Sequence, residues 1–229
     1  AFQVDLDRVK VSATRTDKVP NTSPTAASSG TDLNGMAALD ACEKIKQRLV
    51  EFAAETYGVS ADSVRFENNQ VHVGEQQFGW AEFVQQAYMA RVSLSSNGFY
   101  STPKIHYDRE TGQGRPFLYY ANGAACAEVV VDTLTGEYKT MRVDILHDVG
   151  QSLNPAVDIG QIEGGFVQGM GWLTTEELVY SDEGRLLSNG PATYKIPAVS
   201  DAPPDFRVAL LPHSPNREAT VFRSKAVGE

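Results

Sequence analysis

The side chains best suited to chemistry form no generic catalytic or metal-binding motif in this sequence. The four histidines share no metal-ligand spacing with one another or with the two cysteines, Cys42 and Cys126. His147 and Asp148 are adjacent, but neighbours on a strand point to opposite faces. The glycines match neither a dinucleotide-binding turn nor a phosphate-binding loop, and no serine lies in a nucleophile elbow. Two less familiar segments remain as candidates for a site.

The first is a loop of small and hydroxyl-bearing residues, KVPNTSPTAASSGTD, at residues 18–32. Its composition is typical of a flexible linker. It runs, however, into a helix expected to begin at Thr31 or Asp32, residue types that cap helix N-termini. A loop folded onto a helix N-terminus presents backbone N–H groups and the positive end of the helix dipole. We therefore expect this loop to form a seat for an anion or a polar ligand.

The second is the glycine-rich stretch 158–180, which the pattern predicts to be a helix. Each glycine inside a helix costs roughly 1 kcal/mol relative to alanine, so several of them indicate a close approach to a backbone or a ligand. Two stripes follow helical spacing, one small and amide-bearing, the other apolar and expected to face the core. The first comprises Gln161, Gly165, Gln168 and Trp172, and the second comprises Ile162, Phe166, Met170 and Leu173.

The elements that must position these segments alternate between strands and helices. Residues 3–14 alternate apolar and polar side chains, which predicts a strand. The spacing of apolar residues after Asp32 predicts an amphipathic helix that Gly58 closes. Residues 64–73 predict a hairpin around Asn68-Asn69, and residues 80–90 predict a shorter helix with Phe83, Ala87 and Met89 on its apolar face.

The second half of the chain is richer in strands. Residues 91–110 are expected to be extended and turn-rich, and residues 116–132 and 138–148 give the strongest signal for an antiparallel hairpin. A further strand is expected at residues 206–211. We therefore predict an α+β fold of mixed sheets with flanking helices. It forms one domain over residues 1–229, with two possible lobes at about 1–115 and 116–229.

Composition narrows the class of protein. Hydrophobic residues make up 41% and charged residues 21%, which excludes disorder and fibrous repeats. A net charge of −9 argues against nucleic acid or an anionic membrane as the main partner. No apolar run approaches the ~20 residues needed to span a bilayer, and the N-terminus does not resemble a signal peptide. We expect Cys42 and Cys126 to be buried free thiols in a reducing cytoplasm; a disulfide is possible, but the sequence gives it no support.

Both ends suggest a piece of a longer protein. The chain starts without methionine, and Ser224–Glu229 resembles a turn rather than a tail. Five blocks, in order over the whole chain, resemble the xanthine dehydrogenase and aldehyde oxidase family. They are VPNTSPTAAS at 19–28 with TDLNG at 31–35, GFYSTP at 98–103, DILHDVGQSLNPAVDIGQIEGGFVQGMG at 144–171, GPATYKIP at 190–197 and SKAVGE at 224–229. The GFYSTP block and the form of the hairpin favour the xanthine dehydrogenase branch.

The resemblance implies roles for four residues. Glu229 matches the family's catalytic base, which removes a proton from a molybdenum-bound hydroxyl, a task that needs a carboxylate within hydrogen-bond reach. Ala27 and Ser28 match the loop that approaches the molybdenum centre and its pterin, in agreement with the ligand seat expected above. Gln161 matches a glutamine that bonds the pterin ring. On this reading no residue ligates the metal, which Ala27 and Glu229 approach without bonding.

The resemblance also implies a reaction and a set of partners. The parent enzyme would be a cytoplasmic oxidoreductase that hydroxylates hypoxanthine and xanthine to urate, with hydride passing to a Mo=S sulfur and electrons passing on to NAD. The cofactor would be molybdenum-molybdopterin, with iron–sulfur clusters and FAD elsewhere in the complex. The partners would be the purine, the rest of the molybdopterin subunit and the iron–sulfur/FAD subunit, with neither nucleic acid nor membrane.

The sequence also departs from the family pattern. The family's glycine–glutamine cofactor loop and its substrate-gripping arginine, glutamate and aromatic residues belong to segments upstream of Ala1, and the iron–sulfur and flavin modules have no trace here. A pair of the Val-Ser type is replaced by Ser29-Gly30. The isolated chain is therefore expected to be inactive. Two alternatives stay open: a related molybdenum hydroxylase that acts on aldehydes or other N-heterocycles, and a non-catalytic assembly module.

Overall fold

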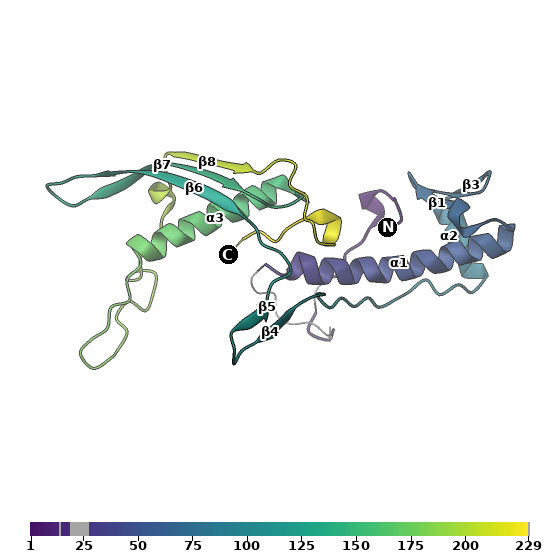
Figure 1. Ribbon diagram of the computed structural model, residues 1–229, viewed down its shortest axis with the longest axis horizontal. Coiled ribbons are helices and arrows are strands. Elements are labelled where there is room, and N and C mark those ends of the chain that lie inside the picture. The colour runs from purple at the N-terminus through teal and green to yellow at the C-terminus, as the bar shows by residue number, and fades with distance from the viewer. Residues whose placement is uncertain (14, 19–27, 229) are drawn as a thin grey trace. The chain divides into compact units, whose positions relative to one another are not determined.

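The computed structural model describes residues 1–13, 15–18 and 28–228, which fall into two compact units (Figure 1). The first unit is built from described residues of 1–25 and 33–102, and the second from those of 26–32 and 103–229. The helix α1 (Gly30–Tyr57) begins in the second unit and continues through the first. The predicted single domain with lobes at about 1–115 and 116–229 stays a prediction.

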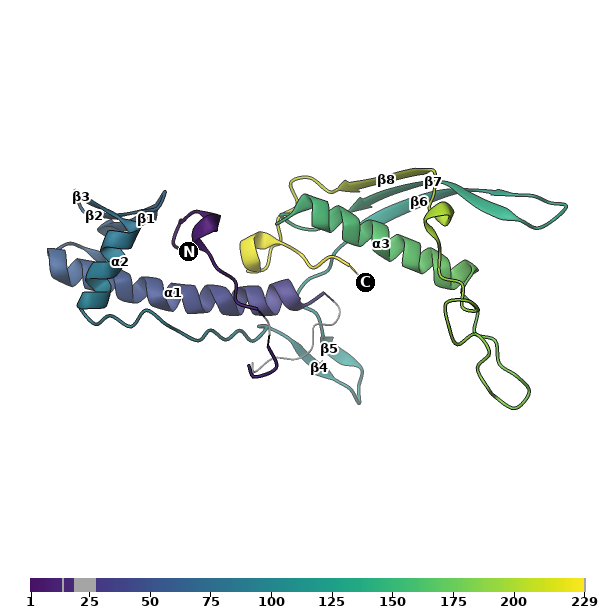
Figure 2. The same ribbon diagram turned by 180° about the vertical axis from the view of Figure 1, so that it is seen from behind.

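The first unit has an apolar core between one face of α1, a small sheet and a second helix (Figure 2). The sheet is antiparallel, with strand order β1-β2-β3: Val64–Glu67, Gln70–Val73 and Gln76–Gly79. The helix α2 (Trp80–Met89) follows at once. Alternate strand residues and helix residues three or four apart point to one side, so both kinds of element bury one face. The core comprises Leu49, Ala53, Val64, Phe66, Val71, Val73, Phe83 and Ala87.

The hairpin between β1 and β2 forms as the sequence predicts. Asn68 and Asn69 both have positive φ, 48° and 62°, the conformation that a two-residue hairpin turn requires. The helices α1 and α2 also begin and end within two residues of the predicted bounds, and Gly58, with φ 65°, closes α1. In α2, Met89 is 71% exposed and does not join the core.

The predicted strand at residues 3–14 is wrong. Residues 6–8 form a short 3-10 helix, and Val9 and Val11 are exposed. The alternating pattern there has no neighbouring strand among the described residues to complete a ladder, and a lone strand leaves its backbone groups unpaired. The segment is held instead at its start, where Phe2 packs on the core and Asp5 exchanges two 2.8 Å hydrogen bonds with the side chain of Asn69.

The extended segment predicted after α2 lies alongside α1 (Figures 1 and 2). Arg48 of α1 donates to the carbonyls of Ser93 and Ser95, at 3.0 and 2.9 Å. Asp40 accepts the backbone N–H of Phe99 at 3.0 Å. Polar side chains of the helix therefore satisfy backbone groups that lack a sheet partner.

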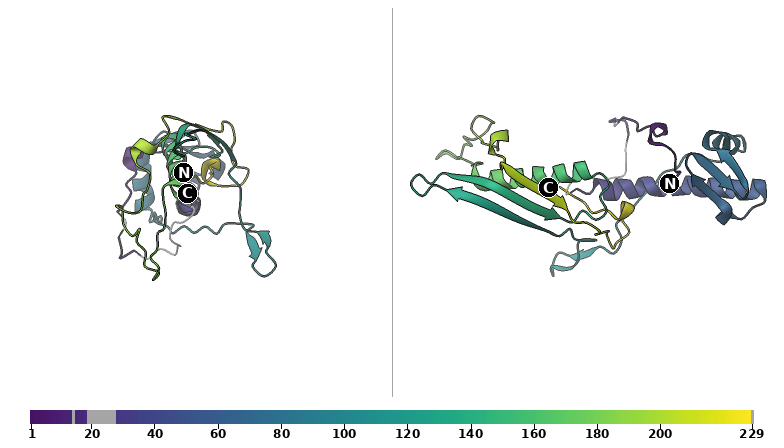
Figure 3. Two further views of the ribbon diagram at one scale, coloured as in Figure 1. Left: turned by 90° about the vertical axis from the view of Figure 1, so that its left-hand side faces the viewer. Right: turned by 90° about the horizontal axis from the view of Figure 1, so that it is seen from above.

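The second unit is a three-stranded sheet with α3 (Pro155–Thr174) along one face (Figure 3). The predicted long hairpin is confirmed as β6 (Gly123–Val131) and β7 (Tyr138–His147). After α3 the chain returns as β8 (Asp205–Leu210), which pairs with β7 in parallel, so α3 is the crossover that parallel strands require. Phe166 of α3 packs against Phe206 of β8 with ring centroids 5.3 Å apart and the rings tilted by 57°.

Smaller elements complete the second unit. A short antiparallel pair, β4 (His106–Asp108) and β5 (Gln113–Arg115), lies ahead of β6 and was not predicted. This unit also contains the short 3-10 helices Val199–Asp201 and Val221–Arg223, and a further one, Ala61–Ser63, precedes β1 in the first unit. None of the helices in the described part of the chain combines the length and apolarity needed to cross a membrane.

The helix predicted at 158–180 starts three residues earlier and ends at Thr174. The side chain of Asn154 caps it by accepting the N–H of Val157 at 3.4 Å, and Pro155 follows in the first turn. The predicted close approach holds at Gly171, where a Cβ would lie 2.5 Å from Pro197. At Gly160, Gly164 and Gly165, no atom of the described structure outside the helix's own backbone lies within 4 Å of such a Cβ.

The predicted apolar stripe of α3 is correct for only part of its length. Ile162 is buried and Phe166 packs on β8, but Leu173 is 77% exposed. The segment that follows α3 covers its last turn at Gly171 but leaves Leu173 open to solvent. Burial of both cysteines was likewise expected, but Cys126 on β6 is exposed and Cys42 is half-buried; both are free thiols. Cys126 is exposed because it lies on β6, whose residues are all exposed in this chain.

Candidate functional site

Two of the four residues singled out by sequence come together in the second unit. Ser28 lies in the loop before α1, Gln161 lies on α3, and both approach Gly228. A Cβ built on Gly228 would lie 2.5 Å from Gln161 Oε1 and 3.1 Å from Ser28 Oγ. The other two, Ala27 and Glu229, lie outside the described residues. Each is adjacent in sequence to a member of this cluster, Ala27 to Ser28 and Glu229 to Gly228.

Glycine is required at position 228 for two reasons. Its φ of 118° is a conformation that side-chain-bearing residues rarely adopt, and there is no room for a Cβ between the amide of Gln161 and the hydroxyl of Ser28. The segment before Glu229 therefore passes between one amide and one hydroxyl. Both groups are neutral, and each can donate and accept hydrogen bonds.

The segment that leads to Gly228 is held by backbone pairing with residues 149–151. Gly150 and Ser224 form an isolated antiparallel bridge. The N–H of Lys225 donates to the carbonyl of Val149 at 2.8 Å, and the N–H of Gln151 donates to the carbonyl of Arg223 at 3.0 Å. Gly150 has φ 65°, and a Cβ there would lie 2.5 Å from the Arg223 carbonyl oxygen, so this crossing also requires glycine.

Buried polar side chains secure the same turn. The carbonyl of Ser224 accepts from Asn216 Nδ2 at 3.0 Å and from Thr220 Oγ1 at 2.6 Å. All three residues are at most 8% exposed. Buried polar groups are costly unless they are hydrogen-bonded, and here each of the three takes part in a hydrogen bond. The turn is therefore fixed by directional bonds rather than by apolar packing.

A buried ion pair joins Lys225 to Asp148. Their side chains are 11% and 4% exposed, and Lys225 Nζ also donates to the carbonyl of Tyr120 at 3.0 Å. Burial alone would raise the pKa of Asp148, but hydrogen bonds from Lys225, the Gly150 N–H and Ser214 outweigh it and lower that pKa. Asp148 is therefore a charged anchor for the segment before Glu229.

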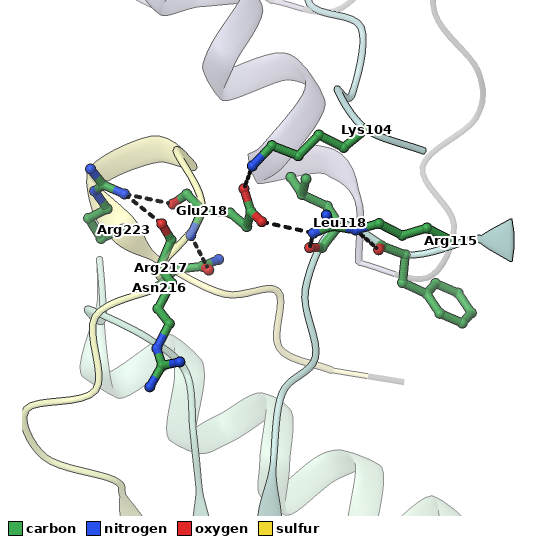
Figure 4. Close-up of polar contacts among 8 residues, drawn as sticks. Lys104, Arg115, Leu118, Asn216, Arg217, Glu218 and Arg223 are labelled. Atoms are coloured by element: carbon green, nitrogen blue, oxygen red, sulfur yellow. Dashed lines mark hydrogen bonds and ion pairs between the residues drawn. The ribbon is translucent and has the colours of Figure 1, made fainter. Parts of the chain in front are cut away.

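A second, more exposed cluster surrounds Glu218 (Figure 4). Its carboxylate accepts from Lys104 at 2.7 Å and from Arg115 at 2.8 Å, and these bonds hold the pKa of Glu218 below its usual value. Arg115 also donates to the carbonyl of Leu118 at 2.7 Å, and Arg223 donates to the Glu218 carbonyl at 3.1 Å. The cluster ties the turn at 216–223 to the end of β5.

Sequence reasoning did not identify Asp148 and Lys225 as anchors. Lys225 belongs to the SKAVGE block and Asp148 to the DILHDVG block, but the family resemblance implies no role for either side chain. They are 77 positions apart, so no local spacing signals their pairing. No group of three or more histidine, cysteine or acidic side chains able to hold a metal ion occurs among the described residues.

Known structures share this fold. Quinoline 2-oxidoreductase from Pseudomonas putida 86 superposes with a TM-score of 0.72 at 24% identity, over 88% of this chain and 25% of that one. A likeness at this identity speaks for the fold alone. The predicted α+β class, with its mixed sheets and flanking helices, is thereby confirmed.

Sequence comparison goes further. Residues 1–203 match the family model described as the molybdopterin cofactor-binding domain, and the chain belongs to that family. It is 48% identical over 229 residues to xanthine dehydrogenase/oxidase of Felis catus, and 47% identical over 232 residues to xanthine dehydrogenase of Dictyostelium discoideum. Each alignment covers 100% of this chain and 16% of the relative, so the chain spans about a sixth of these proteins. The resemblance to the xanthine dehydrogenase and aldehyde oxidase family is confirmed.

Proposed function

We propose that this chain forms part of the molybdopterin-binding subunit of a xanthine dehydrogenase that hydroxylates hypoxanthine and xanthine to urate. The observation that carries the proposal is the convergence of Ser28 and Gln161 on Gly228, the residue before Glu229. Three segments far apart in sequence thus meet where the resemblance assigns cofactor contacts and a catalytic base. The identities of 48% and 47% to xanthine dehydrogenases over the full chain support the substrate class.

The residues present fit the proposed cofactor. The Gln161 amide is exposed and the Ser28 hydroxyl is half-buried, so both can bond the polar edge of a pterin or its phosphate. Because residue 228 is glycine, the backbone there can lie close to both side chains. When bound, the molybdenum centre supplies the oxygen atom and accepts the two electrons of the hydroxylation. No residue of this chain is proposed to ligate the metal.

The chain's own contribution to the chemistry is proton transfer and positioning. Glu229 would accept the proton of the hydroxyl that attacks the electron-poor purine carbon. Such a base must be held within hydrogen-bond reach of that proton, since a misplacement of about 1 Å can cost 10²-fold in rate. The anchoring of Ser224 and Lys225 on residues 148–151 supplies a rigid approach to this position.

The rest of the enzyme would complete the site and carry the electrons away. The remaining part of the molybdopterin subunit would bring the other cofactor loops and the residues that grip the purine. An iron–sulfur and FAD subunit would pass electrons to NAD, and the enzyme would work in the cytoplasm, in keeping with the two free thiols. Turnover of purines, aldehydes and quinolines by the full-length enzyme separates this function from that of a related hydroxylase.

The cofactor role of Gln161 is tested by Gln161→Ala in the full-length enzyme. Loss of the amide removes a hydrogen bond to the cofactor, so molybdenum and pterin content should fall several-fold while kcat per bound molybdenum stays near wild type. Elemental analysis and pterin fluorescence measure the content. The matched control is Gln47→Ala, at an exposed glutamine of α1 whose side chain donates to Glu51 at 2.9 Å, and it should retain full content. Normal content in Gln161→Ala would remove Gln161 from the site.

A further inference from the structure

A single tyrosine joins the start of α1 to the segment before Glu229. Tyr119 lies in the extended stretch between β5 and β6, within the second unit. Its hydroxyl accepts the backbone N–H of Ala226 at 2.7 Å and donates to Asp32 Oδ2 at 2.5 Å. Neither sequence pattern nor the family resemblance had pointed to this residue.

The two hydrogen bonds of Tyr119 fix each other's direction. A phenol has one proton to donate, and here the proton goes to the carboxylate of Asp32. The oxygen lone pairs are then left for a donor, which is the N–H of Ala226. Reversal of the hydroxyl would break both bonds. The tyrosine therefore acts as a directional clamp on one backbone group.

Asp32 is a suitable fixed end for this clamp. It lies in the first turn of α1, and burial raises the pKa of its carboxyl, a rise that the hydrogen bond from Tyr119 offsets only in part. Its second oxygen, Oδ1, is buried and has no hydrogen-bond partner among the described residues. Among the described residues Tyr119 is the side chain that donates to this carboxyl, so removal of the tyrosine hydroxyl leaves a buried carboxyl without that bond.

The clamp acts where the backbone ladder stops. The N–H of Lys225 is satisfied by the carbonyl of Val149, and the next N–H, that of Ala226, is satisfied by Tyr119. Gly228 is then seated against Gln161 and Ser28. The chain is thus fixed at Ala226 and again at Gly228, with one residue between them and Glu229 directly after.

We propose that Tyr119 is a positioning residue for Glu229, acting through the backbone of Ala226 and oriented by Asp32. This inference rests on the proposed function, in which Glu229 is the base. In addition to the SKAVGE segment itself, a side chain from the stretch between β5 and β6 then positions the base. Tyr119 touches neither substrate nor cofactor in this account.

The test is Tyr119→Phe in the full-length holoenzyme, with Tyr120→Phe as the matched control. Tyr120 is the next residue, its side chain is 64% exposed, and the substitution leaves its carbonyl intact. We expect kcat per bound molybdenum to fall about 10-fold or more in Tyr119→Phe, with KM within about twofold of wild type, because displacement of a base slows proton transfer and leaves substrate binding intact. Tyr120→Phe should match wild type.

A second readout does not depend on activity. Hydrogen–deuterium exchange of the peptide that contains Ala226 should be at least about 10-fold faster at that amide in Tyr119→Phe and unchanged in Tyr120→Phe, because the amide loses its acceptor. An unchanged exchange rate at Ala226, or an unchanged kcat per molybdenum in Tyr119→Phe, would overturn the inference. Reduced cofactor content at normal kcat per molybdenum would likewise show a merely structural role.

Substitutions at Asp32 keep the inference testable if Tyr119→Phe does not fold. Asp32→Asn retains an acceptor oxygen for the tyrosine and should keep kcat within about threefold, whereas Asp32→Ala removes the acceptor that orients the hydroxyl and should lower kcat as Tyr119→Phe does. Equal kcat in the two variants would contradict the clamp. Glu229→Gln separates the hypotheses: full turnover in that variant refutes the proposed function, whereas an inactive Glu229→Gln beside a normal Tyr119→Phe refutes only the clamp.

Discussion

The two units of this chain bury different kinds of side chain. In the first unit the fully buried residues are apolar and form one cluster around Phe83, which contacts the rings of Phe52, Phe66 and Phe78. In the second unit the buried residues include Asp148, Ser188, Asn216, Thr220 and Ser224, and every buried polar residue described belongs to that unit. Apolar burial is non-directional and stabilises, whereas buried hydrogen bonds fix geometry. The first unit is therefore a scaffold, and the second holds one segment in place.

The largest expected change in stability comes from the core of the first unit. Phe83→Ala should lower the free energy of unfolding by about 4 kcal/mol, because a fully buried ring is replaced by a cavity. Urea unfolding followed by near-ultraviolet circular dichroism measures this change. Tyr88→Ala on the same helix, at a site 65% exposed, is the control and should change it by less than about 0.5 kcal/mol. A loss below about 1 kcal/mol for Phe83→Ala would mean that the first unit does not depend on this core.

The buried ion pair of the second unit should respond differently to single and double substitution. Lys225→Met leaves Asp148 buried without its partner and should cost about 3 kcal/mol. Replacing both partners, in Lys225→Met with Asp148→Leu, should recover most of that loss, because no uncompensated charge remains. The double variant should nevertheless stay impaired in kcat. Equal losses of stability in the single and double variants would show that the two side chains do not interact.

The same pair predicts a pH dependence. The pKa of Asp148 is lowered in the folded protein from a usual value of 3.8, so its stabilising contribution is present above that value and is lost as pH falls through the folded pKa. The stability difference between wild type and Asp148→Asn should therefore be constant from about pH 7 to pH 5 and shrink below about pH 4. Urea midpoints across this range measure it. A difference that grows on acidification would contradict the assignment.

The smallest effect is expected at an exposed ion pair of the same unit. Arg207 bonds Asp205 at 2.7 Å, but the two side chains are 57% and 41% exposed. Solvent and salt screen such pairs, so Arg207→Gln should leave the unfolding midpoint unchanged within error. This variant is also the control for Lys225→Met. If Arg207→Gln lowered the stability as much as Lys225→Met does, buried and exposed ion pairs would not differ in their contribution.

The sequence predicted the elements whose signals are local. The turn at Asn68-Asn69, the hairpin of β6 and β7 and the end of α1 at Gly58 all follow from neighbouring residue types. The strand expected at 3–14 failed because alternation alone does not provide a partner strand. At the site, the resemblance named Ser28 and Gln161, which lie far apart in the chain and meet only through folding. Tyr119 and Asp148 were missed because they contact Ala226 and Lys225, which lie 107 and 77 positions away in the sequence, and no local pattern signals such pairs.

The most direct test of the account is turnover of Glu229→Gln in the full-length enzyme, measured per bound molybdenum. Glutamine keeps the size and hydrogen bonding of glutamate but cannot accept the proton. Turnover of xanthine should therefore fall by about 10²–10⁴-fold, while molybdenum and pterin content stay at wild-type levels. Wild-type turnover would contradict the role of Glu229 as base, and loss of cofactor would show that the residue holds the site rather than reacts in it.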